Sequence, residues 1–284
     1  MTTDPSTPDR QQGRGMTLHP SDVKKTAVEL GIPILTPEKH RDPDFLESLR
    51  KLEADIFVVV AYKILPKEVF TIPKIGAFNI HASLLPKYRG AAPINWAIIR
   101  GERETGITTF LLEEKVDTGK ILLAKSLPIG SDETAGELHD RLMLLGSEVC
   151  SETLAGLASG SLHPTGQPAD LATTAPKIFP KDCIINFNEP REKVHNFIRV
   201  LSPYPGAATE VGGHRLKILR SHLATDIPKL AVGEFQISPD SKRLFVGTSS
   251  EPLEILEIQR DGKRAMPTEE FLRGNANLFH SPNS

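Results

Sequence analysis

The segments DIFVVVAY (Asp55–Tyr62) and GAFNIHA (Gly76–Ala82) are the two most strand-like stretches of the first half of the chain. In the first, Ile, Phe and Val follow one another without alternation, which is typical of a strand buried on both faces of a parallel sheet. On both sides of these segments, helical and strand patterns alternate. Helices are predicted after the N-cap Ser21 and at 42–54, 67–70, 92–101 and 132–157, and strands at 32–35, 106–113 and 120–129. The alternation predicts an α/β fold with a doubly wound, Rossmann-like sheet.

The composition changes near residue 159, where a stretch rich in proline and small residues begins. We therefore predict a first domain over 1–158, an extended linker over 159–176 and a second domain over 177–284. The second domain has one helical pattern at 189–201 and short strand patterns at 213–219, 233–238, 243–248 and 252–259, which favour a small β-barrel. The polar residues 1–18 are expected to be loop or tail.

Composition excludes several classes of protein. The chain has 284 residues, 39% of them hydrophobic, which is enough to build buried cores. Two cysteines cannot form a disulfide scaffold, and no apolar run reaches the roughly 20 residues of a membrane span. No signal peptide is visible, so we expect a soluble, cytoplasmic protein with no membrane partner. The net charge of −2 excludes a strongly basic coat protein, although residues 175–284 by themselves carry a net positive charge.

Three polar residues stand where an α/β sheet places its ligands. Asn79 and His81 are two residues apart on a predicted strand, so both side chains point to the same side near its carboxyl end. Asp117 lies in a DTG turn. A histidine can move protons near neutral pH, an amide can donate to an oxyanion, and a carboxylate can orient an imidazole. The trio suits transfer at a carbonyl carbon; a buried structural histidine is the alternative reading of the same pattern.

The segment GAFNIHASLLPKYRGAAPINWAIIRGERETGITTFLLEEKVDTGKILL (Gly76–Leu123) closely resembles the methionyl-tRNA formyltransferase family. The similarity extends through PDRQQGRG (Pro8–Gly15), VVVAYKILPKEV (Val58–Val69) and, more weakly, DGKRAMPTEEFLRG (Asp261–Gly274), so it covers nearly the whole chain. The resemblance implies transfer of a formyl group from 10-formyltetrahydrofolate to the amino group of methionyl initiator tRNA. It also implies that the second domain is an OB-like barrel with further RNA contacts.

The resemblance assigns roles to particular residues. Asn79, His81 and Asp117 match the catalytic trio of the family. Folate contacts are implied for Ser83, Leu84, Leu85, Pro86, Val60 and Tyr62. Contacts with tRNA are expected at Arg14, in the family's basic loop, and at Arg89, beside the site. No metal is expected, because the histidines and cysteines form no cluster with ligand spacing. A monomer is the default expectation.

The beginning of the chain departs from the family pattern. Members of the family usually open with a strand, a G-T-P turn and a helix, about 30 residues in all, before the equivalent of Thr3. We therefore expect the sequence to be short at its N-terminus. Two other functions stay open: a related formyl-folate enzyme acting on an amino sugar nucleotide, and a non-catalytic remnant disabled by that loss.

Overall fold

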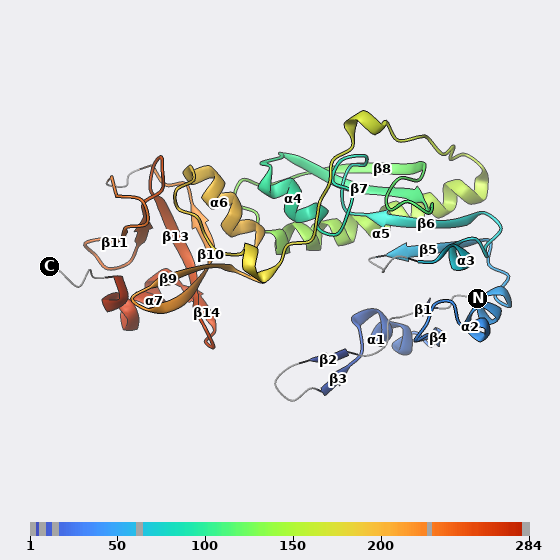
Figure 1. The fold of residues 1–284 in the computed structure, drawn as a ribbon, viewed down its shortest axis with the longest axis horizontal. Coiled ribbons are helices and arrows are strands. Elements are labelled where there is room, and N and C mark those ends of the chain that lie inside the picture. Colours follow the sequence, from blue (N-terminus) through green and yellow to red (C-terminus); the bar gives the residue numbers. More distant parts are fainter. Residues whose placement is uncertain (1–3, 6–9, 13–16, 61–64, 226–228, 280–284) are drawn as a thin grey trace. The chain divides into compact units, whose positions relative to one another are not determined.

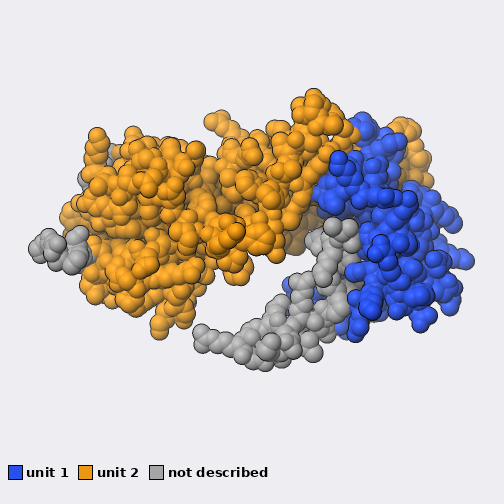
Figure 2. All heavy atoms as spheres, in the orientation of Figure 1, with its two compact units in different colours: residues 1–80, 110–120, 164–166 blue, residues 81–109, 121–163, 167–284 orange. Residues whose placement is uncertain are grey.

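The structure, a computed structural model, describes residues 4–5, 10–12, 17–60, 65–225 and 229–279 (Figure 1). The chain divides into two compact units, coloured separately in Figure 2. Unit 1 comprises residues 1–80, 110–120 and 164–166, and unit 2 comprises residues 81–109, 121–163 and 167–284. Within the described ranges, no helix combines the length and the apolar character needed to cross a membrane.

Unit 1 begins with short elements and ends on a parallel pair of strands. In chain order these are β1 (Asp4–Pro5), β2 (Arg10–Gln12), β3 (Thr17–His19), α1 (Asp22–Glu29), β4 (Ile34–Leu35), α2 (Pro43–Arg50), β5 (Ile56–Val60), α3 (Lys67–Phe70) and β6 (Gly76–His81). The buried side chains of Phe45, Leu49 and Val69 form its core. The expectation that residues 1–18 are loop or tail was wrong in part, because β1 pairs with β4 and β2 pairs with β3.

The sheet that carries the predicted site has four strands in the order β5-β6-β7-β8. β7 (Glu104–Leu111) and β8 (Ile121–Pro128) follow β6 in the chain. β5 and β6 are parallel, with Val59 opposite Asn79 in the register. β5 and β6 are thus one parallel pair of the kind predicted, and the DTG turn joins β7 to β8.

Unit 2 continues through α4 (Pro93–Ile99) and α5 (Ala135–Ser159) into the second domain. That domain holds α6 (Arg191–Val200), an antiparallel sheet, and α7 (Thr268–Asn275). Its strands are β9 (Ala207–Val211), β10 (His214–His222), β11 (Phe235–Ile237), β12 (Leu244–Val246), β13 (Leu253–Arg260) and β14 (Ala265–Pro267). They follow the path β11-β12-β13-β10-β9, and β14 pairs with β13. The short antiparallel strands agree with the sequence patterns, whereas closure into an OB-like barrel stays a prediction, and β9, β14 and α7 were not predicted.

Candidate active site

Asn79 and His81 lie at the carboxyl end of β6, on one side of the strand because they are two residues apart. Asn79 belongs to unit 1 and is half-buried, whereas His81 opens unit 2. In the part of the chain that the structure describes, the side-chain amide of Asn79 makes no hydrogen bond. An amide in this state can donate to a ligand oxygen without first breaking a bond within the protein.

The imidazole of His81 is held in one orientation. Only 6% of the residue is exposed, and Nε2 lies 2.9 Å from the main-chain oxygen of Tyr88. A carbonyl oxygen accepts hydrogen bonds but cannot donate them, so Nε2 carries the proton. In the neutral ring, Nδ1 is therefore the basic nitrogen that can take up a further proton.

The loop after β6 is fixed by hydrogen bonds to its neighbour in the sheet. Ser83 is fully buried, and its hydroxyl donates to the main-chain oxygen of Lys87 at 2.7 Å. Thr108, on β7, donates its hydroxyl to the main-chain oxygen of Ser83 at 2.7 Å and accepts from the amide of Leu85 at 3.1 Å. These contacts give residues 83–86, the predicted folate loop, a defined backbone path.

Tyr88 anchors the far end of the same loop. Its phenol donates to Glu102 Oε1 at 2.6 Å, and burial, reinforced by that hydrogen bond, raises the pKa of the phenol well above its usual value. The phenol therefore stays protonated and keeps donating at any physiological pH. Its main-chain amide donates to Thr173 Oγ1 at 2.9 Å.

The predicted linker contributes directly to this loop. Residues 173–175 form main-chain hydrogen bonds with residues 86–92, including Arg89 N to Thr173 O at 2.9 Å and Ala175 N to Arg89 O at 2.7 Å. Gly90, at a φ of +125°, lies so close that a Cβ there would be 2.7 Å from the Ala175 oxygen. Residues 173–175 are thus paired with the loop that follows His81, while Ala169–Leu171, in the same segment, forms a 3-10 helix.

Arg89, the predicted tRNA contact, is bound within the protein. Its Nε and one terminal nitrogen donate to Gln167 Oε1 at 3.1 and 2.6 Å. The guanidinium is thereby oriented, while its remaining donors can still serve a ligand. The contact of Arg89 with tRNA stays a prediction.

Asp117 lies in unit 1, on the turn that leaves β7. Its φ of +55° is a left-handed conformation that aspartate tolerates better than most residues. Gly119 is required nearby, because a Cβ at this position would lie 1.7 Å from the oxygen of Leu111. The turn is closed by a bond from Leu111 N to Lys120 O at 2.9 Å, and Leu112 N donates to Ala77 O at 2.8 Å. These two bonds tie the Asp117 turn to β6 within unit 1; that Asp117 acts on His81 stays a prediction.

Three predicted ligand contacts remain, and only one of them lies within the described residues. Val60, at the end of β5, is 59% exposed. Arg14 and Tyr62 lie outside the described residues. Among those that are described, His, Cys, Asp and Glu form no group of three that could hold a metal ion.

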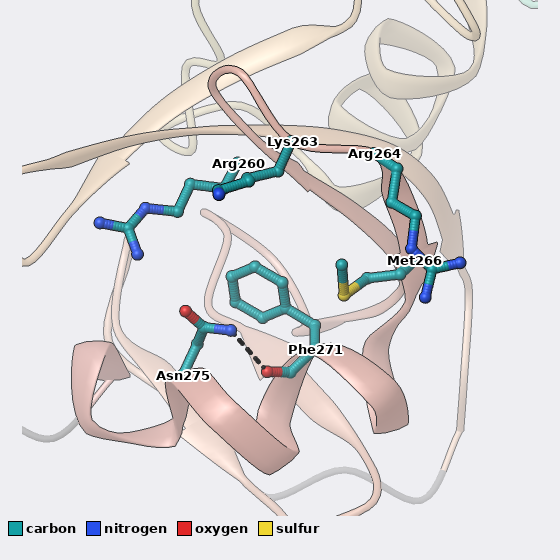
Figure 3. Close-up of a pocket in the computed structure, with 6 residues that line it drawn as sticks. All are labelled: Arg260, Lys263, Arg264, Met266, Phe271 and Asn275. Carbon is teal, nitrogen blue, oxygen red and sulfur yellow. Dashed lines mark hydrogen bonds between the residues drawn. The ribbon is translucent and has the colours of Figure 1, made fainter.

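A hollow of about 280 Å³ lies in the small β domain, away from the candidate active site residues in the sequence. It is lined by Arg260, Lys263, Arg264, Met266, Phe271 and Asn275 (Figure 3). Its two guanidinium groups point away from each other. Arg260 donates to His214 Nδ1 at 3.1 Å, and Arg264 is paired with Glu270. Both guanidinium groups that border the hollow are thus engaged within the protein.

Comparison with known proteins connects both halves of the chain to one kind of enzyme. Residues 5–154 match the family model "Formyl transferase", and residues 177–276 match "Formyl transferase, C-terminal domain". A methionyl-tRNA formyltransferase of Caldanaerobacter subterraneus subsp. tengcongensis is 46% identical over 270 residues, which is 94% of this chain and 87% of that protein.

Solved structures with the same fold are more distant in sequence. Methionyl-tRNA formyltransferase from Clostridium thermocellum matches with a TM-score of 0.53 and 22% identity, over 71% of this chain and 87% of that one. HypX from Aquifex aeolicus, in complex with tetrahydrofolic acid, matches with a TM-score of 0.64 and 20% identity, over 87% of this chain. This chain spans less than half of HypX, 43% of its length.

Proposed function

The chain belongs to the methionyl-tRNA formyltransferase family, and we propose from this premise that it formylates the amino group of methionyl initiator tRNA, with 10-formyltetrahydrofolate as the donor. The two family models and the curated relative confirm the family resemblance of the sequence over both domains. At the site, the proposal rests on two side chains at the same end of β6. The Asn79 amide can donate to a ligand, and the His81 ring is oriented by the hydrogen bond from its Nε2 to the Tyr88 oxygen.

In the proposed reaction, the methionine nitrogen attacks the formyl carbon and the bond from that carbon to N10 of the folate breaks. The carbonyl oxygen gains negative charge during the attack, and the Asn79 amide donates to it. Nδ1 of His81 accepts the proton that the amine loses and passes it towards the departing folate nitrogen. Asp117 favours the charged form of the imidazole while it carries that proton.

The folate is proposed to lie along residues 83–86. This loop suits a flat ligand because its backbone is fixed by Thr108 and by the Ser83 hydroxyl. Arg89 and the second domain are proposed to contact tRNA, whose phosphates attract the net positive charge of residues 175–284.

A formyl-transfer assay with charged initiator tRNA tests this function. We expect wild-type turnover, and a loss of about 100-fold or more in kcat for His81→Ala, the usual share of a general base. The control is His139→Ala, which removes an imidazole that is 62% exposed on α5. Wild-type turnover by His81→Ala would contradict the mechanism. Formylation of an amino sugar nucleotide alone would favour the related enzyme, and folate binding without turnover would favour the remnant.

A further inference from the structure

Tyr88 connects His81 to Thr173 and Glu102 through hydrogen bonds. Its carbonyl oxygen accepts from His81 Nε2, its amide donates to Thr173 Oγ1, and its phenol donates to Glu102. The residue is 6% exposed and adopts a φ of +61°, a backbone conformation that is uncommon outside glycine. A residue in that conformation stays there when its surroundings fix it at several points.

The main chain alone does not fix Tyr88. The ladder between residues 86–92 and 173–175 uses the amides and carbonyls of Arg89, Thr173 and Ala175, together with the amide of Ala92 and the carbonyl of Pro86. The Tyr88 amide is bonded instead to a side chain, the Thr173 hydroxyl. The hydrogen bonds from the Tyr88 amide to Thr173 and from its phenol to Glu102 therefore orient its carbonyl.

The direction of that carbonyl matters because the two neutral tautomers of imidazole have similar energies. One hydrogen bond of ordinary strength shifts such an equilibrium about fivefold or more. If the Tyr88 oxygen turned away, the proton could reside on Nδ1, and that nitrogen would then be unable to accept one from the substrate.

We propose that Thr173 and Glu102 are positioning residues for His81, which hold the Tyr88 carbonyl against Nε2 and so keep Nδ1 as the proton acceptor. The proposal rests on the function proposed for His81. It gives the segment between the two domains a part in the chemistry, through a threonine that lies 85 residues from Tyr88 in the chain.

The test compares Thr173→Val with Thr173→Ser in the full chain, with Thr174→Val as the control at the exposed neighbouring position. Nitrogen NMR of labelled histidine reports the His81 tautomer, and steady-state kinetics with methionyl initiator tRNA separates kcat from KM. We expect Thr173→Val to lose the single Nε2-protonated state and about tenfold in kcat, as for other partners that orient a functional histidine, with KM nearly unchanged. Thr173→Ser restores both properties, and Thr174→Val behaves as wild type.

Glu102→Gln provides a second measurement, which decides the question if Thr173→Val fails to fold. This variant keeps the size of the side chain and weakens the acceptor for the Tyr88 phenol, so the same tautomer mixing is expected. An unchanged His81 tautomer in the folded variants would overturn the proposal, even if activity fell. If the wild type formylates no methionyl-tRNA, the proposed function fails, and the NMR measurement still tests the positioning.

Discussion

Gly90 is a residue at which the loop and the interdomain segment approach closely. Its φ of +125° is strained for any other residue, and a Cβ would lie 2.7 Å from the Ala175 oxygen. Gly76 has a similar φ of +106°, but a Cβ there would meet nothing within 4 Å. The two glycines thus separate the cost of backbone strain from the cost of a steric clash.

Gly90→Ala is expected to lower the unfolding free energy by about 1 kcal/mol more than Gly76→Ala, because both variants carry strain and only the first also pushes two paired segments apart. Urea unfolding of the two variants measures the difference. Equal losses would mean that the Ala175 oxygen moves aside without cost.

His195 is a buried titratable residue outside the candidate active site. It is 2% exposed, Nε2 donates to Ser131 O at 3.0 Å, and Nδ1 accepts from the Ser221 hydroxyl at 3.0 Å. Burial is the main cause that lowers the pKa of His195 below its usual 6.5; Arg199 and His222 act in the same direction, while the Ser131 hydrogen bond and Asp132 oppose it. The residue is therefore neutral when the protein is folded at neutral pH.

This burial predicts a loss of stability in mild acid. Well above pH 6.5 the ring is neutral in both the folded and the unfolded chain, so it adds no pH dependence there. Below that value the unfolded chain gains a proton that the folded chain resists, and the unfolding free energy falls. Urea midpoints should drop between about pH 7 and pH 5, and they should drop less in His195→Gln. His139→Gln, at an exposed site, is the control, and an equal drop in His195→Gln would contradict the assignment.

At the site, the placement of Asn79 and His81 on one strand could be predicted from the sequence, whereas the supporting contacts could not. The two-residue spacing of Asn79 and His81 is a local pattern that any strand turns into a shared side. Thr173 and Gln167, in contrast, meet Tyr88 and Arg89 across 85 and 78 residues. Neither is distinguished by its neighbours in sequence, since only the folded path of the chain brings the partners together.

Among the elements, α1 begins directly after the predicted N-cap Ser21, and α2 begins one residue after the predicted helix start at Asp42. Ser21 accepts from Lys24 N at 3.2 Å at the start of α1, and Asp42 accepts from Asp44 N at 2.9 Å at the start of α2. β9 was not predicted because its sequence, AATEV, is short and contains little apolar surface. α7 was not predicted because it begins directly after β14, without a turn signal between them.

The first turn of α5 is closed by a capping box. Thr134 Oγ1 accepts from Glu137 N at 3.2 Å, and Glu137 Oε2 accepts from Thr134 N at 2.9 Å. Thr134→Ala should therefore lower the unfolding free energy by about 1 kcal/mol, while Thr134→Ser should cost much less. Thermal unfolding followed by circular dichroism checks both, and equal stability of the two variants would show that the methyl group matters more than the cap.

At the scale of the whole molecule, the small β domain and the second half of the catalytic domain share unit 2. Asn95 Nδ2, on α4, donates to Val200 O at 2.9 Å. Arg199, on α6 and 5% exposed, donates to the oxygens of Gly130 and Glu133, each at 3.0 Å. Since both carbonyls face one guanidinium, its removal leaves them without that donor.

Arg199→Ala should lower the unfolding free energy by about 2–4 kcal/mol, because two main-chain acceptors lose a charged donor and the packing of a buried side chain is lost. Trp96, the one tryptophan of the chain, donates to Pro176 O at 2.8 Å and reports on the junction. We expect its fluorescence to change together with circular dichroism during wild-type unfolding and before it in Arg199→Ala. Lys193→Ala, at an exposed residue of the same helix, is the control. A single coincident transition at wild-type stability would show that Arg199 does not join the domains.

The pairing of residues 173–175 with the loop after His81 also bears on how this protein can be rebuilt. A designer who treats the two domains as interchangeable modules would join a new partner to the first one through a glycine-serine spacer. Such a chimaera would lack the Thr173 hydroxyl and the main-chain partners of Arg89 and Ala92. The cut that preserves the first module therefore lies after Pro176, and the residues from Gln167 onward should travel with it.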